Sequence, residues 1–270
     1  MPDAKPHAKP AGPPIASATV LTLRDGADGL EVFMLVRNRQ VDFASGALVF
    51  PGGKVDAQDT HADWARLAPL SQPAPERSYW VAALRETFEE TGLLLAEPEG
   101  ARATIAAEVA MKLAHAHRED VASGKLPFAR LIESAGLVLA TERMVPFAHW
   151  ITPDGMPKRF DTHFFLAAAP PGQAARHDGG EAVESMWIRP ADAVRDAVAG
   201  RRTLVPATQL NLEKLAAAPT VAEAFAQARA SRIVSVTPTV VRAEGGVVIR
   251  IPADAGYATT EVFLARASPA

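Results

Sequence analysis

The chain has 270 residues, 48% of them hydrophobic and 22% charged, which is enough for one large globular domain with its own core. A formal net charge of −3 argues against nucleic acid or anionic membrane as a partner, because no overall positive field would attract either. The absence of cysteine excludes disulfides, thiolate metal sites and thiol nucleophiles.

Residues 1–14 are rich in proline, alanine and lysine and lack the apolar stretch of a secretory signal. This composition predicts a disordered leader. No segment approaches the roughly 20 apolar residues that a membrane-spanning helix needs. We therefore expect a cytoplasmic protein.

The rest of the chain mixes short β-branched runs with alanine-rich helical segments. In chain order, we predict strands over residues 15–23, 31–37 and 47–50, helices over residues 78–91, 101–121 and 128–135, strands over residues 163–168 and 185–188, helices over residues 191–199, 210–217 and 221–230, and an antiparallel pair over residues 233–241 and 246–251. This order indicates an α/β or α+β fold with helices packed on a sheet.

Two segments are predicted to be insertions. Residues 59–78 are rich in proline and alanine and are expected to form an inserted loop, and the helices within about 100–140 would form a helical insertion. No linker is long enough to demand a second domain, so residues 15–270 are expected to form one domain.

The helix predicted at residues 78–91 carries three glutamates on one face. Glu89 and Glu90 follow Glu86 by three and four positions, and residues at this spacing are neighbours on a helix. A cation would relieve their repulsion, and Mg²⁺ suits oxygen ligands and keeps waters that can bridge to phosphates. The alternative is a solvated acidic face on which Arg85 makes a surface ion pair.

A glycine loop precedes this helix. Pro51 ends the strand before it, and Gly52 and Gly53 permit close approach of the backbone to a ligand. Beside a metal-binding helix, such a loop is typical of a phosphate site.

These residues resemble the signature of the Nudix hydrolases, G-x5-E-x7-R-E-U-x-E-E-x-G-U, in which U is a bulky aliphatic residue. The matching positions are Gly53, Arg85, Glu86, Glu89, Glu90, Gly92 and Leu93. The resemblance implies an α/β/α sandwich with a mixed sheet, Mg²⁺ or Mn²⁺ bound by the three glutamates, and Arg85 as the residue that orients them.

The signature is interrupted. Asp59 stands where the first glutamate belongs and is not counted among the expected site residues, and Thr87 replaces the aliphatic residue. The segment between Asp59 and Arg85 has 25 residues (60–84) in place of seven. This interruption resembles the subfamily named nudix motif 19, whose mammalian members are coenzyme A diphosphatases.

That resemblance implies hydrolysis of coenzyme A or acyl-coenzyme A to 3′-phosphoadenosine 5′-phosphate and 4′-phosphopantetheine or its acyl form. Alternative substrates are NADH, ADP-ribose or nucleotide sugars, because the signature specifies the chemistry and not the leaving group. An alternative of another class is a non-catalytic domain that senses nucleotides. The expected partner is thus a small nucleoside diphosphate derivative, and a homodimer is left open.

Further candidates lie outside the Nudix signature. Glu181, with Glu184 as its competitor, is a candidate for a late glutamate that ligates metal or acts as base, as in other family members. Arg37, Arg39 and Arg159 are candidates for phosphate contacts, because arginine binds phosphate with two parallel hydrogen bonds. The alternative for Arg37 and Arg39 is surface charge at the end of a strand, and the alternative for Arg159 is an ion pair with Asp161.

The histidines give no clear metal site. His115 and His117 are two apart on a predicted helix and would not face each other. His61, His149 and His163 are isolated in the sequence, and we predict structural roles for them.

Overall fold

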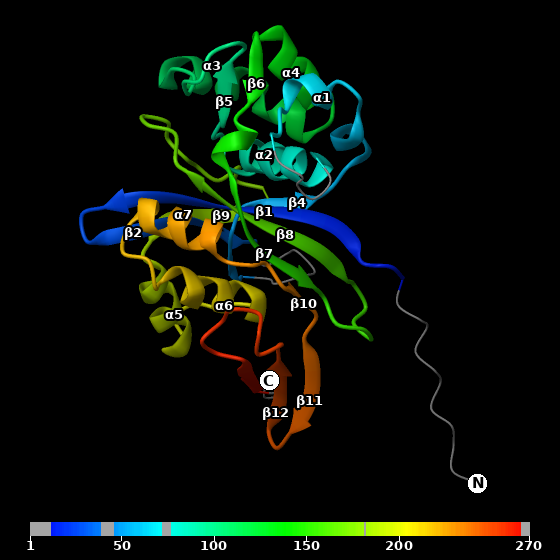
Figure 1. Ribbon diagram of the computed structural model, residues 1–270, viewed down its shortest axis with the longest axis vertical. Helices are drawn as coiled ribbons and strands as arrows, with labels where there is room; N and C mark the ends of the chain where they lie inside the picture. The colour runs from blue at the N-terminus through cyan, green and yellow to red at the C-terminus, as the bar shows by residue number, and fades with distance from the viewer. Residues whose placement is uncertain (1–11, 39–45, 72–76, 181, 266–270) are drawn as a thin grey trace.

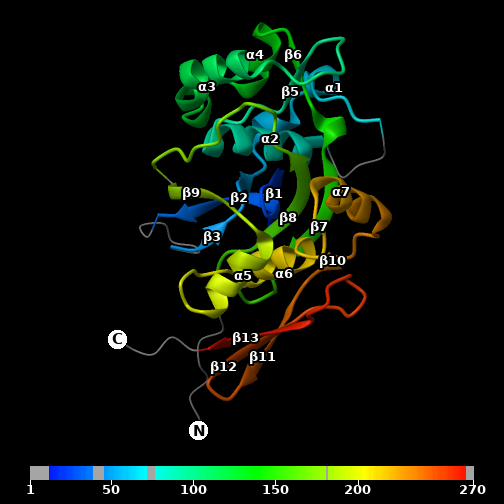
Figure 2. The same cartoon turned by 90° about the vertical axis from the view of Figure 1, so that its left-hand side faces the viewer.

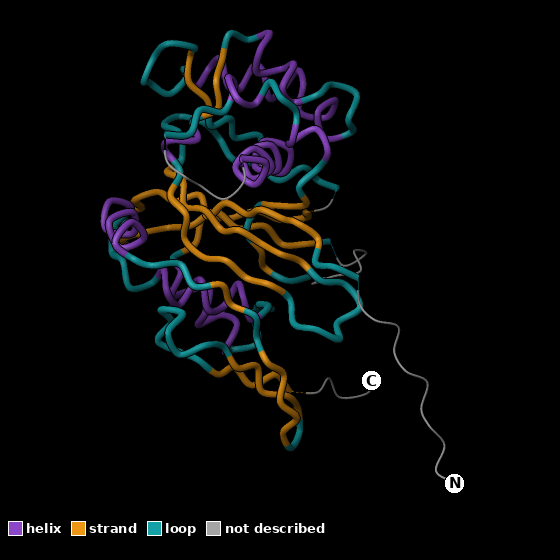
Figure 3. Tube along the Cα trace, turned by 45° about the vertical axis from the view of Figure 1, so that its right-hand side comes forward, coloured by secondary structure: helices purple, strands orange, loops and turns teal. Residues whose placement is uncertain are grey.

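The computed structural model of the chain describes residues 12–38, 46–71, 77–180 and 182–265. Its centre is a mixed sheet with helices on both faces, as Figures 1 and 3 show. The strands of this sheet are β1 (Ile15–Gly26), β2 (Gly29–Arg37), β3 (Leu48–Val49), β4 (Gly52–Lys54), β7 (Val145–Ile151), β8 (Phe160–Ala168), β9 (Ala182–Ile188) and β10 (Ser235–Val236).

The strand order is β10-β7-β8-β1-β2-β3, with β4 also paired to β1 and β9 to β2. The β1–β8 and β10–β7 pairs are parallel, and the other pairs of this sheet are antiparallel. The strands predicted over residues 15–23 and 31–37 are confirmed as β1 and β2, which form an antiparallel pair. Strand β1 therefore lies in the middle of the sheet, between β8 on one side and β2 and β4 on the other.

One face of the sheet is covered by the helix Arg77–Thr91 and the elements packed around it. These are η1 (Ala57–Thr60, a 3-10 helix), α1 (Trp64–Leu67), α2 (Arg77–Thr91), β5 (Ala96–Pro98), α3 (Ala107–Ala122), α4 (Phe128–Ser134), β6 (Leu137–Leu139) and η2 (Thr141–Arg143, a 3-10 helix). The opposite face carries α5 (Pro190–Val198), α6 (Pro206–Leu215) and α7 (Val221–Ala230). The α/β/α sandwich with a helical insertion after α2 is thus confirmed.

The alternation of side chains along the strands builds a core on each face of the sheet. On β1, Ala18 and Val20 are buried against α2, whereas Leu21 and Leu23 are buried on the side of α6 and α7. On β8, Phe165 faces α2, where its ring lies 4.6 Å from that of Trp80. Residues two positions from Phe165 on β8 therefore share the face that α2 covers.

A second sheet lies below the first at the C-terminal end of the described chain (Figure 2). Its strands β11 (Thr239–Ala243), β12 (Gly246–Arg250) and β13 (Glu261–Ala265) are antiparallel. Tyr257 connects it to the main body: its hydroxyl accepts a hydrogen bond from Trp150 Nε1 at 2.8 Å and donates one to Asn211 Oδ1 at 2.7 Å, all three residues being buried.

Several predicted boundaries are wrong. Residues 59–78 are not simply a loop, because η1 and α1 form there, and the helix predicted from residue 101 begins at Ala107. The strand predicted over residues 233–241 is divided: Pro238, which cannot donate to a ladder, separates β10 from β11, and these join different sheets. Strand β7 was not predicted, and its Pro146 lies at an irregularity in the pairing with β8. Among the described residues, no helix has the length and apolar character to cross a bilayer.

We predict that Tyr257→Phe lowers the free energy of unfolding by about 1–3 kcal/mol, because it leaves Trp150 and Asn211 without their shared buried partner. Chemical denaturation would measure the change. Val240→Thr, a change of the same small size on an exposed position of β11, should alter stability by less than about 0.5 kcal/mol. Equal effects of the two substitutions would contradict a bridging role for Tyr257.

Candidate functional site

A buried arginine organises the carboxylates of α2. Arg85 is 2% exposed, and its Nη1 donates to Glu86 Oε1 at 2.9 Å and to both oxygens of Glu89 at 3.1 Å. Its Nη2 donates to the backbone carbonyl of Lys54 at 2.9 Å, which connects the helix to β4. The structure therefore excludes the solvated surface ion pair considered for Arg85, because this guanidinium is enclosed by its partners.

The remaining side of the guanidinium is held by Asp59. Arg85 Nε and Nη2 each donate to one oxygen of that carboxylate at 2.9 Å, and the Asp59 side chain is fully buried. The short helix η1 fixes Asp59, because the backbone N–H of Asp56 donates to Asp59 Oδ2 at 2.8 Å. Sequence reasoning missed this residue, although its place in the signature, six positions after Gly53, was the available signal.

The glycine loop lies directly against the glutamates. The backbone N–H of Gly52 donates to Glu90 Oε2 at 2.8 Å. A Cβ added at Gly53 would lie 2.4 Å from Glu86 Cδ, a distance that real contacts do not show. Any side chain at Gly53 would displace the Glu86 carboxylate, so the second glycine of the loop is needed for space.

The carboxylates of the cluster outnumber the guanidinium that they share, that of Arg85. Burial raises the pKa of Glu86 to about 7, since the attraction of Arg85 does not offset the loss of water. Burial also raises the pKa of Glu89. The atoms that these carboxylates could offer to a metal ion are all oxygen. Glu86, Glu89 and Glu90 thus offer the ligand type that Mg²⁺ and Mn²⁺ prefer.

Arg118 on α3 also lies at the site, although its sequence position did not predict this. Its Nε donates to the backbone carbonyl of Glu89 at 2.7 Å, and its Nη2 is buried with no hydrogen-bond partner among the described residues. Burial lowers the pKa of Arg118, while Asp178 and Glu90 act in the opposite direction. The helical insertion therefore brings a cation to the C-terminal end of the carboxylate helix.

Two further expected site residues, Arg37 and Arg159, are among those that the structure describes. Arg37 ends β2 opposite Ala182 of β9. Arg159 pairs with Asp154 at 2.9 Å and donates to Thr152 O at 3.0 Å, so the pairing with Asp161 considered for it is wrong.

Of the two late glutamates, only Glu184 is among the residues that the structure describes. Glu184 is held by Arg202 through two hydrogen bonds of 2.9 and 3.0 Å, and this lowers the pKa of Glu184. Arg39 and Glu181 lie outside the described residues. His149 and His163, which are isolated in the sequence, lie together in the structure, where their rings stack with centroids 4.1 Å apart.

We predict that Asp59→Asn lowers the free energy of unfolding by about 3 kcal/mol, because it leaves the charge of Arg85 buried without its best partner. Denaturation in the presence of a chelator would measure this. The control is Asp56→Asn: Asp56 lies 3.8 Å from the same guanidinium but is 54% exposed, and its loss should cost less than about 1 kcal/mol. Similar costs would show that burial of Asp59 is not what matters.

We also predict a pH dependence of the metal-free protein. The pKa of Glu86 is about 7 in the folded state, against an ordinary value of 4.5, so Glu86 binds more protons in the folded state than in the unfolded state between these pH values. The free energy of unfolding should therefore fall as pH rises from about 4.5 to about 7, by an amount on the order of 2 kcal/mol. Glu86→Gln should remove this part of the slope, and identical slopes in both proteins would refute the assignment.

The chain resembles known proteins in both sequence and structure. A family model described as the NUDT19 Nudix domain matches residues 73–215. The protein named acyl-coenzyme A diphosphatase NUDT19 of Gallus gallus is 28% identical over 210 residues, which are 61% of this chain and 55% of the relative. The protein of the same name from Homo sapiens is 28% identical over 231 residues, which are 70% of this chain and 61% of the relative.

The putative nudix hydrolase 7 of Caenorhabditis elegans is 30% identical and is matched over 68% of this chain and 55% of its own length. The chain thus spans between about half and three fifths of the length of these relatives. A crystal structure of a NUDIX hydrolase from Alicyclobacillus acidocaldarius superposes with a TM-score of 0.66 at 27% identity, covering 79% of this chain and 96% of that one. The family match covers more than half of the sequence, and the chain belongs to the NUDT19 Nudix domain family.

Proposed function

We propose that the chain hydrolyses the diphosphate linkage of coenzyme A or acyl-coenzyme A with the help of Mg²⁺, for which Mn²⁺ can substitute. The products would be 3′-phosphoadenosine 5′-phosphate and 4′-phosphopantetheine or its acyl form. The observation that carries the proposal is the buried Arg85, which holds Glu86 and Glu89 beside the Gly52–Gly53 loop. The names of the relatives at 24–28% identity support the choice of substrate.

The residues present suit a hard divalent cation. Glu86, Glu89 and Glu90 would hold it, since they are adjacent carboxylates with raised pKa values at Glu86 and Glu89. When bound, the ion would neutralise charge on the phosphoryl oxygens and favour ionisation of an attacking water. In the absence of a cation, the same carboxylates would repel a diphosphate.

The chain's own groups would position the substrate. Arg85 fixes the carboxylates of Glu86 and Glu89 through hydrogen bonds to both, so these side chains would need little reorganisation when the substrate binds. Gly53 keeps backbone close to that surface without a side chain. We propose that the Nη2 of Arg118, for which the described part of the chain offers no partner, donates to a phosphate oxygen, which would satisfy a buried donor and bring positive charge to the diphosphate. Arg37 and Arg159 are proposed as further phosphate contacts.

The proposal predicts that Glu89→Gln and Glu90→Gln each lower kcat for coenzyme A at saturating Mg²⁺ by about 100-fold or more, since each removes a charged ligand of the cation. Glu108→Gln, on the exposed side of α3, is the control and should keep the wild-type rate. Product analysis by mass spectrometry in ¹⁸O-water would identify the products and the phosphorus that is attacked.

The same assay should include acyl-coenzyme A, NADH and ADP-ribose. A higher kcat/KM for ADP-ribose or NADH would overturn the proposed coenzyme A substrate but would leave the proposed hydrolysis of a diphosphate linkage unchanged. Near wild-type rates in both glutamate variants would overturn the metal site. If the chain bound nucleotides but cleaved none of these substrates, the proposed enzymatic function would be wrong and the chain would be a nucleotide sensor.

A further inference from the structure

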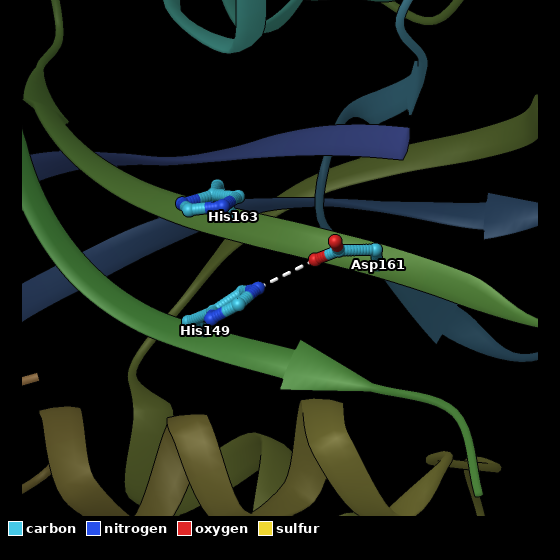
Figure 4. A group of neighbouring side chains, drawn as sticks. All are labelled: His149, Asp161 and His163. Atoms are coloured by element: carbon cyan, nitrogen blue, oxygen red, sulfur yellow. Dashed lines mark hydrogen bonds and ion pairs between the residues drawn. The ribbon is translucent and has the colours of Figure 1, made fainter. Parts of the chain in front are cut away.

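A second group of metal-ligating side chains lies on strands β7 and β8, outside the carboxylate cluster. Asp161 and His163 are two positions apart on β8 and therefore share one face of the sheet, and His149 is the register partner of His163 on β7. Figure 4 shows the side chains of His149 and Asp161 directed toward each other, with His163 beside them. One ligand atom from each of the three residues lies within 4.8 Å of the others.

The ring of His149 is held from both sides. Its Nε2 lies 2.5 Å from Asp161 Oδ1, and its Nδ1 lies 2.7 Å from Ser235 Oγ on β10. A metal-ligating histidine is commonly oriented by a hydrogen bond to its other ring nitrogen, and Ser235 supplies that bond when Nε2 faces an ion. The site thus contains an outer partner for one ligand as well as the ligands themselves.

His163 contacts two neighbouring rings. Its ring centroid lies 4.1 Å from that of His149 and 4.2 Å from that of Tyr79 on α2. A neutral imidazole has a lone pair on one of its two ring nitrogens, and this lone pair is what a metal ion binds.

We propose that His149, Asp161 and His163 bind a divalent transition-metal ion of the zinc type, at a site distinct from the carboxylates of α2. Two imidazoles and one carboxylate are the ligands of three-residue zinc sites, which leave a further position open. Ligand atoms at about 2.0–2.2 Å from zinc are at most about 4.4 Å apart, so the three ligand atoms must move closer by a few tenths of an ångström. The two stacked imidazole rings must also turn until the lone pairs in their ring planes point at the ion. The ion replaces the proton shared by His149 and Asp161.

The two sites are neighbours across a single strand. Ala18 of β1 is paired with His163 on one side and with Gly53 on the other. Strands in a sheet are about 5 Å apart, so the backbones that carry the two sites are about 10 Å apart. The donor sets differ, because carboxylate oxygens suit Mg²⁺ whereas imidazoles favour zinc-type ions. Saturating Mg²⁺ should therefore leave the histidine site free for zinc.

The test is a titration of the full chain with Zn²⁺ in excess Mg²⁺, followed with a competing chromophoric indicator. Wild type should bind one zinc ion with micromolar or tighter affinity. His149→Gln, Asp161→Asn and His163→Gln should each weaken binding at least 10-fold, and Ser235→Ala should weaken it about 10-fold. His115→Gln, an exposed histidine on α3, and Glu89→Gln are the controls and should bind as wild type does.

A second measurement on the wild-type chain is independent of how the variants fold. Of the seven histidines in the sequence, zinc at one equivalent should shift the imidazole ¹⁵N resonances of two, and these should be the two lost in the His149 and His163 variants. Unchanged zinc affinity in the three ligand variants, or a loss of zinc binding in Glu89→Gln instead, would overturn the proposal. So would zinc shifts on histidines other than these two.

Discussion

The bidentate contact between Arg85 and Asp59 is the interaction on which the candidate site depends. A buried guanidinium is costly unless its donors are all used, and here one carboxylate takes two of them while β4 and α2 take the rest. Because Asp59 comes from η1, the contact fixes the loop after β4 against α2. The glutamates are therefore positioned by tertiary structure and not only by helical spacing.

The chemistry of this site was largely readable from the sequence, because it lies within one helix. The spacing of Glu86, Glu89 and Glu90 determines that they share a face, and Gly92 ends α2 with a positive φ of 74°, as its place in the sequence predicts. The departure at Thr87 is also explained, since its hydroxyl donates to Ala83 O within the helix and the residue packs as an aliphatic one.

What the sequence could not supply is long-range pairing. Asp59 is 26 residues from Arg85, and nothing local indicates that the two meet. Arg118 approaches Glu89 only because α3 folds back over α2. His149 and His163 look isolated, yet the register of β7 and β8 places them opposite each other. Strand β7 itself was not predicted, and Pro146 interrupts its apolar pattern, so nothing in the local sequence indicated that register.

Strand β1 links the backbones of the two sites. Its backbone is bonded to β4, which carries Gly53, and to β8, which carries His163, and both partners meet at Ala18. Amide protons in this part of β1 exchange with solvent only when one of the two ladders opens. Their protection is therefore a single readout for both sites, in which a ligand that stabilises either ladder slows exchange on the strand between them.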